Sequence, residues 1–292
     1  DWRYIYIFLL PLVVISLVLG LASLPREGAK TPKKLALRPV IALSIMFFAF
    51  ISALSAEHLM TFALLFIVGL VGAFLFFRFN RKESLIDLGI LQNHRFVALI
   101  FSLLVYQALL LGLSFVLPSF IQVSAGFSSS VAGLFMFPGA LIGAVLAPIS
   151  GKVLDQIGAR KPITTGLILA ALGLALLFVF LPTKSLALLL VAHIVLMLGL
   201  GISYSNLMTC SLSTLATDQL SDGNALVNTL QQFIGAVATA VVATTLSIFQ
   251  GLNGFKVGTS HGTSIILALF FILIIVSLIV SFPNLKKIRA NH

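Results

Sequence analysis

The sequence predicts an all-α polytopic membrane protein with nine transmembrane helices, and composition, periodicity and charge placement each lead to that fold class. Of the 292 residues, 60% are apolar and 9% are charged, with a mean hydropathy of +1.16. A soluble domain averages roughly 45–50% apolar and roughly 25% charged residues. A chain this apolar could not cover a water-facing surface, which argues against a soluble globular enzyme and excludes intrinsic disorder. The single cysteine, Cys210, rules out a disulfide framework and a cysteine-based metal cluster.

Each predicted span is an apolar stretch bounded by charges or turn residues. A membrane helix needs about 20 mostly apolar residues. The apolar residues run all round each stretch instead of alternating with period two, which indicates helices and not barrel strands. The expected spans are 4–24, 39–55, 59–77, 96–117, 131–150, 163–181, 186–208, 224–249 and 264–282.

The basic residues predict the orientation of the chain. Fifteen of the 18 Lys and Arg residues fall in alternate segments between the spans, and the other segments hold only Arg3, Lys184 and Lys256. The positive-inside rule places the richer set in the cytoplasm. We therefore expect a multi-pass protein of the plasma membrane with its N-terminus outside and its C-terminus cytoplasmic. The net charge of +10 is then explained by the lipid bilayer as partner, and no nucleic acid is expected.

The start of the chain predicts a fragment. The first residue is Asp1 instead of Met, and the first span follows almost at once with its N-terminus outside. A chain that begins in this way is expected to be part of a longer protein.

The stretch 131–150 carries small residues every four positions and two prolines. Small residues at this spacing let two helix backbones approach closely, and prolines loosen the hydrogen-bond ladder and bend a membrane helix. These residues could form a hinge at which the helix bends, or they could serve only static packing between helices. The residues are Gly139, Gly143, Ala147 and Gly151, with Pro138 and Pro148.

A cytoplasmic turn follows this span, from Gly151 to Pro162, with Asp155, Gly158, Arg160 and Lys161 inside it. Its pattern resembles the signature loop of the major facilitator superfamily, Gly-x-x-x-Asp-x-x-Gly-x-Arg/Lys-Arg/Lys. The glycines permit a short turn, and Asp155 can lie near a helix N-terminus or pair with a base. Contacts that form in one global state and break in another would make the loop a cytoplasmic latch. The alternative is a positive-inside turn with an incidental Asp.

Three further stretches resemble the fourteen-helix drug:proton antiporter branch of that superfamily. Residues 2–11 are similar to the opening of its sixth helix, although Leu9 replaces the usual Asn. Residues 117–122, with the Gly and Pro residues that follow, resemble the hinge between helices nine and ten. Residues 220–228 resemble the start of helix thirteen, where Ile234 and Ala238 stand in for residues that are often Gly. The nine spans then correspond to helices six to fourteen.

This resemblance implies a domain organisation and an activity. Residues 1–25 would be the last helix of the N-terminal bundle, 26–95 a linker region with two extra transmembrane helices, and 96–292 the C-terminal six-helix bundle of a major facilitator fold. The implied function is proton-coupled efflux of drugs or amphiphilic compounds by alternating access. The proton gradient would supply the energy and no cofactor is implied. The membrane acid that carries the proton would belong to the missing N-terminal half.

Three other functions are alternatives to efflux. A major facilitator transporter of a specific metabolite would share the same visible motifs. A truncated transporter could fold and move nothing. A membrane enzyme is not expected, because the spans hold no acid pair, no histidines with metal-ligand spacing and no Ser/His/Asp group.

Polar residues inside the last six spans are the candidates for a substrate cavity. His193 is the ionisable one, so it is a candidate for proton relay or substrate binding, with hydrogen-bonded packing between helices as the alternative. The tyrosine and the amides could line a cavity for a small amphiphilic substrate or form interhelical hydrogen bonds. No metal site is predicted. The cavity candidates are Tyr106, Gln107, His193, Asn206, Asn228, Gln231 and Gln232.

Overall fold

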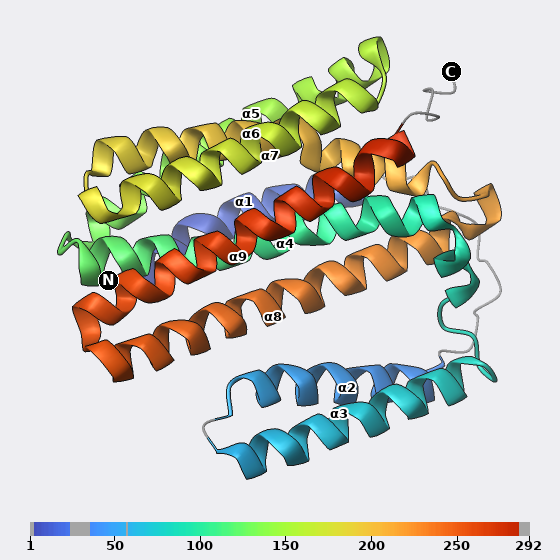
Figure 1. Ribbon diagram of the computed structural model, residues 1–292. Helices are drawn as coiled ribbons and strands as arrows, with labels where there is room; N and C mark the ends of the chain where they lie inside the picture. The colour runs from blue at the N-terminus through green and yellow to red at the C-terminus, as the bar shows by residue number, and fades with distance from the viewer. Residues whose placement is uncertain (1–2, 24–35, 57, 286–292) are drawn as a thin grey trace. The chain divides into compact units, whose positions relative to one another are not determined.

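The computed structural model describes residues 3–23, 36–56 and 58–285, and within them it contains helices and no β-strand (Figure 1). Trp2, the first residue of the stretch 2–11, lies outside the described residues, as do the basic residues at 26–34 and 286–289. Short helical turns occupy Leu88–Gln92, Leu181–Thr183 and Thr217–Gln219, and a π-helical turn occupies Phe120–Ser124. The long helices are α1 (Arg3–Ser23), α2 (Leu37–Leu54), α3 (Leu59–Asn80), α4 (His94–Ser119), α5 (Ser129–Ile157), α6 (Arg160–Phe180), α7 (Leu186–Leu212), α8 (Leu220–Asn253) and α9 (Phe255–Asn284).

The expected spans are confirmed: within the described ranges, nine helices are long and apolar enough to cross a membrane. The helices run beyond the apolar stretches at several ends. Helix α5 continues to Ile157, and α9 begins at Phe255, nine residues before the expected start of the last span. Hydropathy detects the apolar centre of a helix, while its ends continue into polar sequence that the apolar pattern does not mark.

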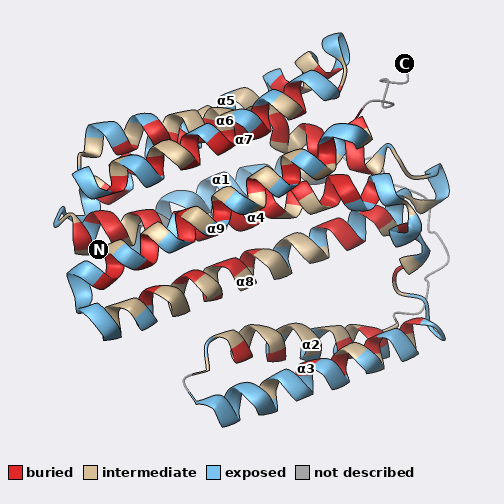
Figure 2. Ribbon diagram, viewed as in Figure 1, coloured by how far each residue is buried: buried red, intermediate tan, exposed pale blue. Residues whose placement is uncertain are grey.

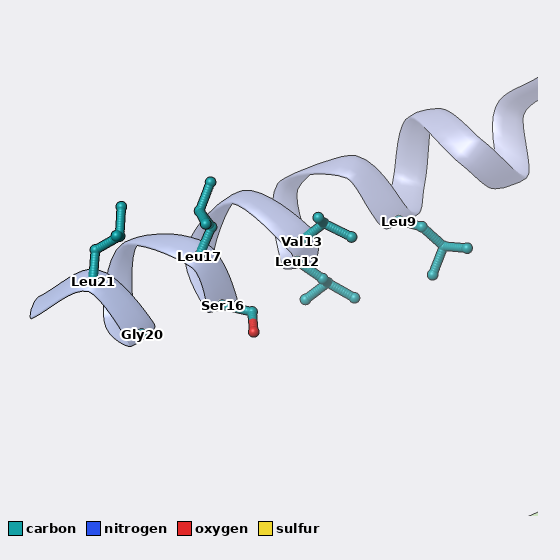
Figure 3. Close-up of a pocket in the computed structure, with 7 residues that line it drawn as sticks. All are labelled: Leu9, Leu12, Val13, Ser16, Leu17, Gly20 and Leu21. Atoms are coloured by element: carbon teal, nitrogen blue, oxygen red, sulfur yellow. The ribbon is translucent and has the colours of Figure 1, made fainter. Parts of the chain in front are cut away.

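Helix α1 forms a unit of its own, within residues 1–36, and is described separately. A shallow groove runs along one side of it, lined mainly by leucines and interrupted by the Ser16 hydroxyl (Figure 3). Its large apolar side chains are exposed within this unit. Such a helix is hydrophobic all round, as expected of a membrane span whose surface is covered by lipid or by other helices.

Residues 37–292 form the second unit, and α4 is the most buried helix in it (Figure 2). Helix α4 packs against α7, α8 and α9, so it lies at the centre of the bundle. Leu99, Leu103, Leu109 and Leu113 recur on it with no exposed surface. These leucines are four, six and four residues apart and share one side of α4. Ile100 and Ala108 lie on other sides of the helix and are also buried, so α4 is covered on several sides.

Helices α6 and α7 pack closely, backbone against backbone. A Cβ atom added to Gly173 would lie 2.5 Å from the Leu196 backbone nitrogen, and one added to Gly199 would lie 2.5 Å from that of Ala170. Real Cβ atoms essentially never approach another heavy atom within 3.0 Å. Glycine is therefore required on both helices, as in other membrane helix pairs that pack through small residues.

The small-residue stripe of α5 packs less closely than expected. Gly139 contacts His193 and Met197 of α7, but a Cβ atom at Gly143 or Gly151 would meet no atom within 4 Å. The prediction of close backbone packing is therefore wrong at Gly143 and Gly151. Gly143 instead lines a cleft between α5 and α7.

Helices α2 and α3 form a hairpin that is attached to the bundle through α8. Gly69 of α3 leaves room for the Phe50 ring of α2. The rings of Phe47 and Phe233 stack with centroids 4.2 Å apart, joining α2 to α8. Thr244 of α8 donates a hydrogen bond of 2.8 Å to the carbonyl of Leu54, at the end of α2.

The loop after α3 is ordered by a buried side chain. The Asn80 amide nitrogen donates to the Ile86 carbonyl at 2.9 Å, and its oxygen accepts from the backbone nitrogens of Leu85 and Ile86 at 2.9 and 3.2 Å. Arg38 and Glu83 form an ion pair of 3.7 Å beside this loop. The loop after α3 is therefore an anchored turn that leads into the short helix Leu88–Gln92.

Two glycine substitutions test which helix pair depends on close packing. We expect Gly173→Ala to lower the melting temperature of the purified chain, because the added methyl group overlaps the α7 backbone, at a cost of about 1–3 kcal/mol. The matched control is Gly143→Ala, whose methyl group enters open space and should leave stability unchanged or raise it by up to about 1 kcal/mol. Equal melting temperatures for the two variants would contradict this packing.

Candidate functional site

A chain of side-chain hydrogen bonds crosses three helices of the bundle. Gln231 on α8 donates from Nε2 to the Tyr204 hydroxyl on α7 at 2.7 Å. The Tyr204 hydroxyl donates in turn to Oε1 of Gln107 on α4 at 2.7 Å. Each bond uses the group's available donor or acceptor, so the chain has a defined direction from α8 to α4.

A second polar pair lies beside this chain. The Ser203 hydroxyl is 2.7 Å from the hydroxyl of the fully buried Tyr106 and 2.7 Å from the Gly199 carbonyl. A carbonyl can only accept, and Ser203 has a single proton. When Ser203 donates to Gly199, Tyr106 must donate to Ser203. The Tyr106 and Tyr204 rings lie side by side, with centroids 6.5 Å apart, so α4 and α7 share two adjacent polar contacts.

Asn206 joins α7 to α5 instead of facing an open cavity. Its Nδ2 donates to the Ser150 carbonyl of α5 at 3.2 Å and to the Ile202 carbonyl of its own helix at 2.9 Å. The hydroxyls of Ser150 and Ser205 are 2.8 Å apart beside it. Asn206 is buried and its amide donors are engaged, so this geometry fits the interhelical hydrogen bond that was the alternative to a cavity residue.

Two of the predicted cavity residues do not join the polar chain. Asn228 is exposed and donates to the backbone and side-chain oxygens of Asn224, one turn earlier on the same helix. Gln232 is also exposed, although its neighbour Gln231 is part of the chain. The two faces of α8 at this level therefore have different environments.

His193 is buried without a hydrogen-bond partner. Its side chain is 1% exposed, and among the described residues neither Nδ1 nor Nε2 has a partner. The ring stacks on Phe135 of α5 at 5.4 Å between centroids. A Cβ atom at Gly139 would lie 2.5 Å from Nε2, so the glycine makes room for the imidazole. An unsatisfied buried polar atom costs about 1–3 kcal/mol, which makes this position exceptional.

A cleft of about 250 Å³ separates α5 from α7. Glycine and alanine residues of α5 form one wall, and residues of α7, among them Met197, Leu200 and Tyr204, form the other. Tyr204 lines the cleft and also belongs to the hydrogen-bonded chain, so the cleft and the chain meet at this residue. The cleft residues are Leu110, Gly139, Ala140, Gly143, Ala144, Ala147, Met197, Leu200, Gly201, Tyr204 and Ser205.

Sequence reasoning missed the residues of α7 that face this cleft. Met197, Gly201 and Tyr204 follow His193 at intervals of four, four and three residues, which places all of them on one face of a helix. This periodicity was visible in the sequence. It could have added Tyr204 to the candidates.

The predicted turn after the small-residue stripe is shorter in the structure. Helix α5 continues through Asp155 to Ile157, and the turn consists of Gly158, with φ at +74°, and Ala159. The sequence predicts that the glycines permit a short turn. Gly158 does so through its positive φ, which other residues rarely adopt. The expected tight turn from 151 to 162 is therefore wrong in extent, because residues 151–157 are helical.

The charged residues of this region do not pair with each other. Asp155 is exposed in the last turn of α5, and no ion pair within the described residues involves it. The helix dipole disfavours an acid at a helix C-terminus. A basic or hydrogen-bonding partner would therefore stabilise the Asp155 carboxylate. The Arg160 guanidinium lies 4.5 Å from the centre of the Phe282 ring, which attaches the start of α6 to α9. Lys161 is exposed.

The described residues contain no group of three or more His, Cys, Asp or Glu side chains that could hold a metal ion. Apart from the His193 imidazole, the polar side chains described above inside the bundle are amides and hydroxyls. Such groups can recognise a ligand by hydrogen bonding but do not by themselves provide a catalytic acid and base.

Residues 1–240 match the family described as Major Facilitator Superfamily, which covers most of the chain. The chain belongs to the major facilitator superfamily. Membership places it among membrane transporters and not enzymes, as the sequence predicts. It also confirms the family resemblance that the loop after α5 suggested.

Individual relatives within the superfamily carry names that refer to drug resistance. The chain is 28% identical over 257 residues to the lincomycin resistance protein LmrB of Listeria monocytogenes, covering 86% of the chain and 55% of the relative. It is 28% identical over 261 residues to a multidrug resistance protein B homologue of Mycobacterium tuberculosis, with coverage of 85% and 48%. It is 24% identical over 263 residues to the multidrug efflux pump LfrA of Mycolicibacterium smegmatis, with coverage of 87% and 51%. The chain therefore spans about half the length of these relatives.

The two adjacent glutamines of α8 provide a test of the polar chain. We expect Gln231→Leu to lower the free energy of unfolding by about 1 kcal/mol, because Tyr204 loses its donor inside the bundle. The matched control is Gln232→Leu, which places an apolar side chain at an exposed position and should not destabilise the protein. Unfolding of both variants in lipid-detergent mixtures measures the difference, and an equal loss in the two would show that the polar chain does not stabilise the bundle.

Proposed function

We propose that this chain is the C-terminal part of a fourteen-helix antiporter that uses the proton gradient to export drugs or amphiphilic compounds. The observation that carries the proposal is the arrangement of a hydrogen-bonded chain, Gln231–Tyr204–Gln107, next to an apolar cleft between α5 and α7. An amphiphile needs both kinds of contact. Superfamily membership and the efflux and resistance names of three relatives support the same activity.

The proposed organisation has three parts. Residues 1–25 supply the last helix of an N-terminal bundle, 26–95 supply a linker region with two extra spans, and 96–292 supply a six-helix bundle. The attachment of the α2–α3 hairpin through α8 supports its treatment as an addition at the periphery of the bundle. The coverage of about half of each relative supports a missing N-terminal half as the partner of this chain.

The proposed orientation places the chain in the plasma membrane with its N-terminus outside and its C-terminus in the cytoplasm. The distribution of basic residues supports this orientation. Among the described residues, Glu83 and Asp155 then lie on the cytoplasmic side. Glu83 lies in the loop after α3, and Asp155 lies in the last turn of α5.

We also propose that the proton is carried by the N-terminal half. The described acids lie in loops or in the terminal turns of helices, away from the centres of the spans: Glu83, Asp87, Asp155, Asp218 and Asp222. A proton-carrying acid must lie within the membrane to couple its charge to substrate movement. No cofactor is needed for such coupling, because the gradient supplies the energy.

Asp155 is proposed as part of a cytoplasmic latch between the two halves of the transporter. Its exposure and lack of an ion pair within the described chain leave its carboxylate available to a basic group or a helix N-terminus of the other half. Gly158 fixes the turn that follows, and Arg160 is held by Phe282. The latch would thus present one acid from a rigid corner.

The latch predicts a transport defect without a folding defect. In cells that express the full-length protein, Asp155→Asn should reduce ethidium efflux at least fivefold while the amount of protein in the membrane stays the same. Glu83→Gln is the matched control, since it removes one negative charge on the same proposed side of the membrane. Unchanged efflux by Asp155→Asn would exclude the latch.

Because the proposed proton site lies in the N-terminal half, the isolated chain should not couple transport to protons. Inverted membrane vesicles containing only these 292 residues should show no proton-linked uptake of ethidium or lincomycin, whereas vesicles with the full-length protein should accumulate at least one of them. Dissipation of the proton gradient should abolish that uptake. Proton-linked uptake by the 292-residue chain alone would contradict the placement of the proton site, and uptake of neither compound by the full-length protein would contradict drug efflux.

A further inference from the structure

We propose that the face of helix α3 opposite α2 is a docking surface for an anionic phospholipid. An exposed apolar stripe on this face would hold the acyl chains, and a basic cluster at the end of the stripe would hold the phosphate. The inference goes beyond the proposed efflux, because it concerns a partner in the bilayer and does not depend on which compound is transported. The continuity of the stripe and the cluster on one helix carries the proposal.

Helix α3 has a packed face and an exposed face. On the packed face, Gly69 leaves room for the Phe50 ring of α2, and a Cβ atom added to Gly72 would lie 2.9 Å from the Met46 backbone nitrogen. Each residue advances about 100° round a helix, so the large apolar side chains of the other face lie on the side away from α2. This α3 stripe consists of side chains that are more than half exposed, namely Ile67, Leu70, Val71, Phe74 and Phe77.

The basic cluster continues the α3 stripe. Arg78 lies four residues after Phe74, and Arg81 and Lys82 follow Arg78 by three and four residues. The backbone remains helical past the end of α3, because Arg81 has φ at −67° and ψ at −27° and the Lys82 nitrogen donates to the Phe79 carbonyl at 2.9 Å. Residues three and four apart are neighbours on a helix surface. The three bases therefore lie on the same side of the helix as the stripe.

The charge of the basic cluster is not neutralised by the acids beside it. All three bases are exposed, and no ion pair within the described residues involves them. Glu83 is paired with Arg38 at 3.7 Å, and the Asp87 carboxylate accepts from the Gly89 nitrogen at 2.8 Å. Three positive charges are thus available to a partner at this end of α3.

The loop after α3 keeps the cluster next to the stripe. The side chain of Asn80 lies within the cluster in sequence but is buried, and it bonds to the backbone of Leu85 and Ile86. These bonds fix the turn that follows Lys82. In the orientation proposed above, the cluster then meets the cytoplasmic leaflet of the membrane.

An anionic phospholipid is the occupant that satisfies both parts of this surface. A soluble phosphate would pair with the bases but leave the stripe uncovered. A zwitterionic lipid would cover the stripe but bring its own positive charge to the bases. Guanidinium groups bind phosphate oxygens in pairs, and basic clusters beside membrane helices attract anionic lipids.

Quenching of a tryptophan by brominated lipids measures which lipid contacts the stripe. The chain has one tryptophan, so Phe74→Trp in a Trp2→Phe background gives a single reporter in the stripe. We expect the 292-residue chain in mixed bilayers to prefer brominated phosphatidylglycerol over brominated phosphatidylcholine about fivefold at this reporter. Attraction of one basic residue to an anionic surface supplies a preference of that order. Equal binding constants for the two lipids would overturn the proposal.

Charge-matched variants locate the preference. Arg78→Gln with Arg81→Gln should reduce the preference to about onefold. The control is Arg95→Gln with Lys152→Gln, which removes two exposed bases of the same proposed side from α4 and α5 and should keep the preference. A preference that survives in the first variant, or that is lost equally in the control, would overturn the assignment to α3.

Further measurements separate charge from folding. Arg78→Lys with Arg81→Lys should retain most of the preference, because both charges remain. Quenching by brominated phosphatidylcholine should be the same in all of these variants, since the stripe still faces lipid. Loss of the preference in the lysine variant while this quenching stays constant would show that the positive charge is not what selects the lipid, and would contradict the proposal.

Competition on the unaltered reporter chain identifies the source of the phosphate. Millimolar inorganic phosphate or glycerol 3-phosphate should not displace brominated phosphatidylglycerol, because neither has an acyl chain. Displacement by either would assign the cluster to a soluble anion and overturn the lipid site.

The same reporter in the full-length protein tests whether protein covers the stripe. Both brominated lipids should still quench it, with the same preference. An absence of quenching by either lipid would show that the N-terminal half or a second copy occupies the surface, and would reject the proposal. The readout is contact with lipid, so a lack of drug efflux would reject the proposed function and leave this surface in place.

Discussion

The structure depends on one constraint, namely that a polar group inside the hydrocarbon layer finds no water to bond with. Backbone groups satisfy it by forming helices, and isolated hydroxyls satisfy it by bonding one turn back along their own helix, as Thr229 does with Ala225 and Thr245 does with Val241. Longer polar side chains can also reach another helix. The hydrogen bonds from Gln231 to Tyr204 and from Tyr204 to Gln107 are therefore where the positions of α8, α7 and α4 become linked.

The spans could be predicted from the sequence because they follow from composition. A stretch of about 20 apolar residues crosses a bilayer whatever its neighbours are. The family followed from the loop around Asp155, whose glycine at position 158 has a backbone that needs glycine. Helix ends were less predictable, because α5 and α9 continue beyond their apolar stretches into residues that hydropathy does not distinguish from loops.

The candidate site was only partly predictable, because it depends on helix rotation and on neighbours. Gln231 and Gln232 are equivalent in sequence, yet they point about 100° apart round α8, and only Gln231 reaches Tyr204. Small residues were equally ambiguous. Gly173 faces a backbone and Gly143 faces open space, and the difference comes from the opposite helix, which no local pattern describes.

The cleft wall on α5 also affects how such a protein can change over generations. The side chains of Ala140, Ala144 and Ala147 are nearly the smallest available, so most substitutions there add atoms to a hollow and remove none from a packed core. A protein sits close to its stability threshold, and mutations that reshape a binding surface are usually limited by the stability they cost. Substitutions in this wall should therefore cost little stability. Under the proposed efflux function, selection by a new toxic compound would alter the contour of the cleft in small steps while the α6–α7 contact keeps the bundle folded.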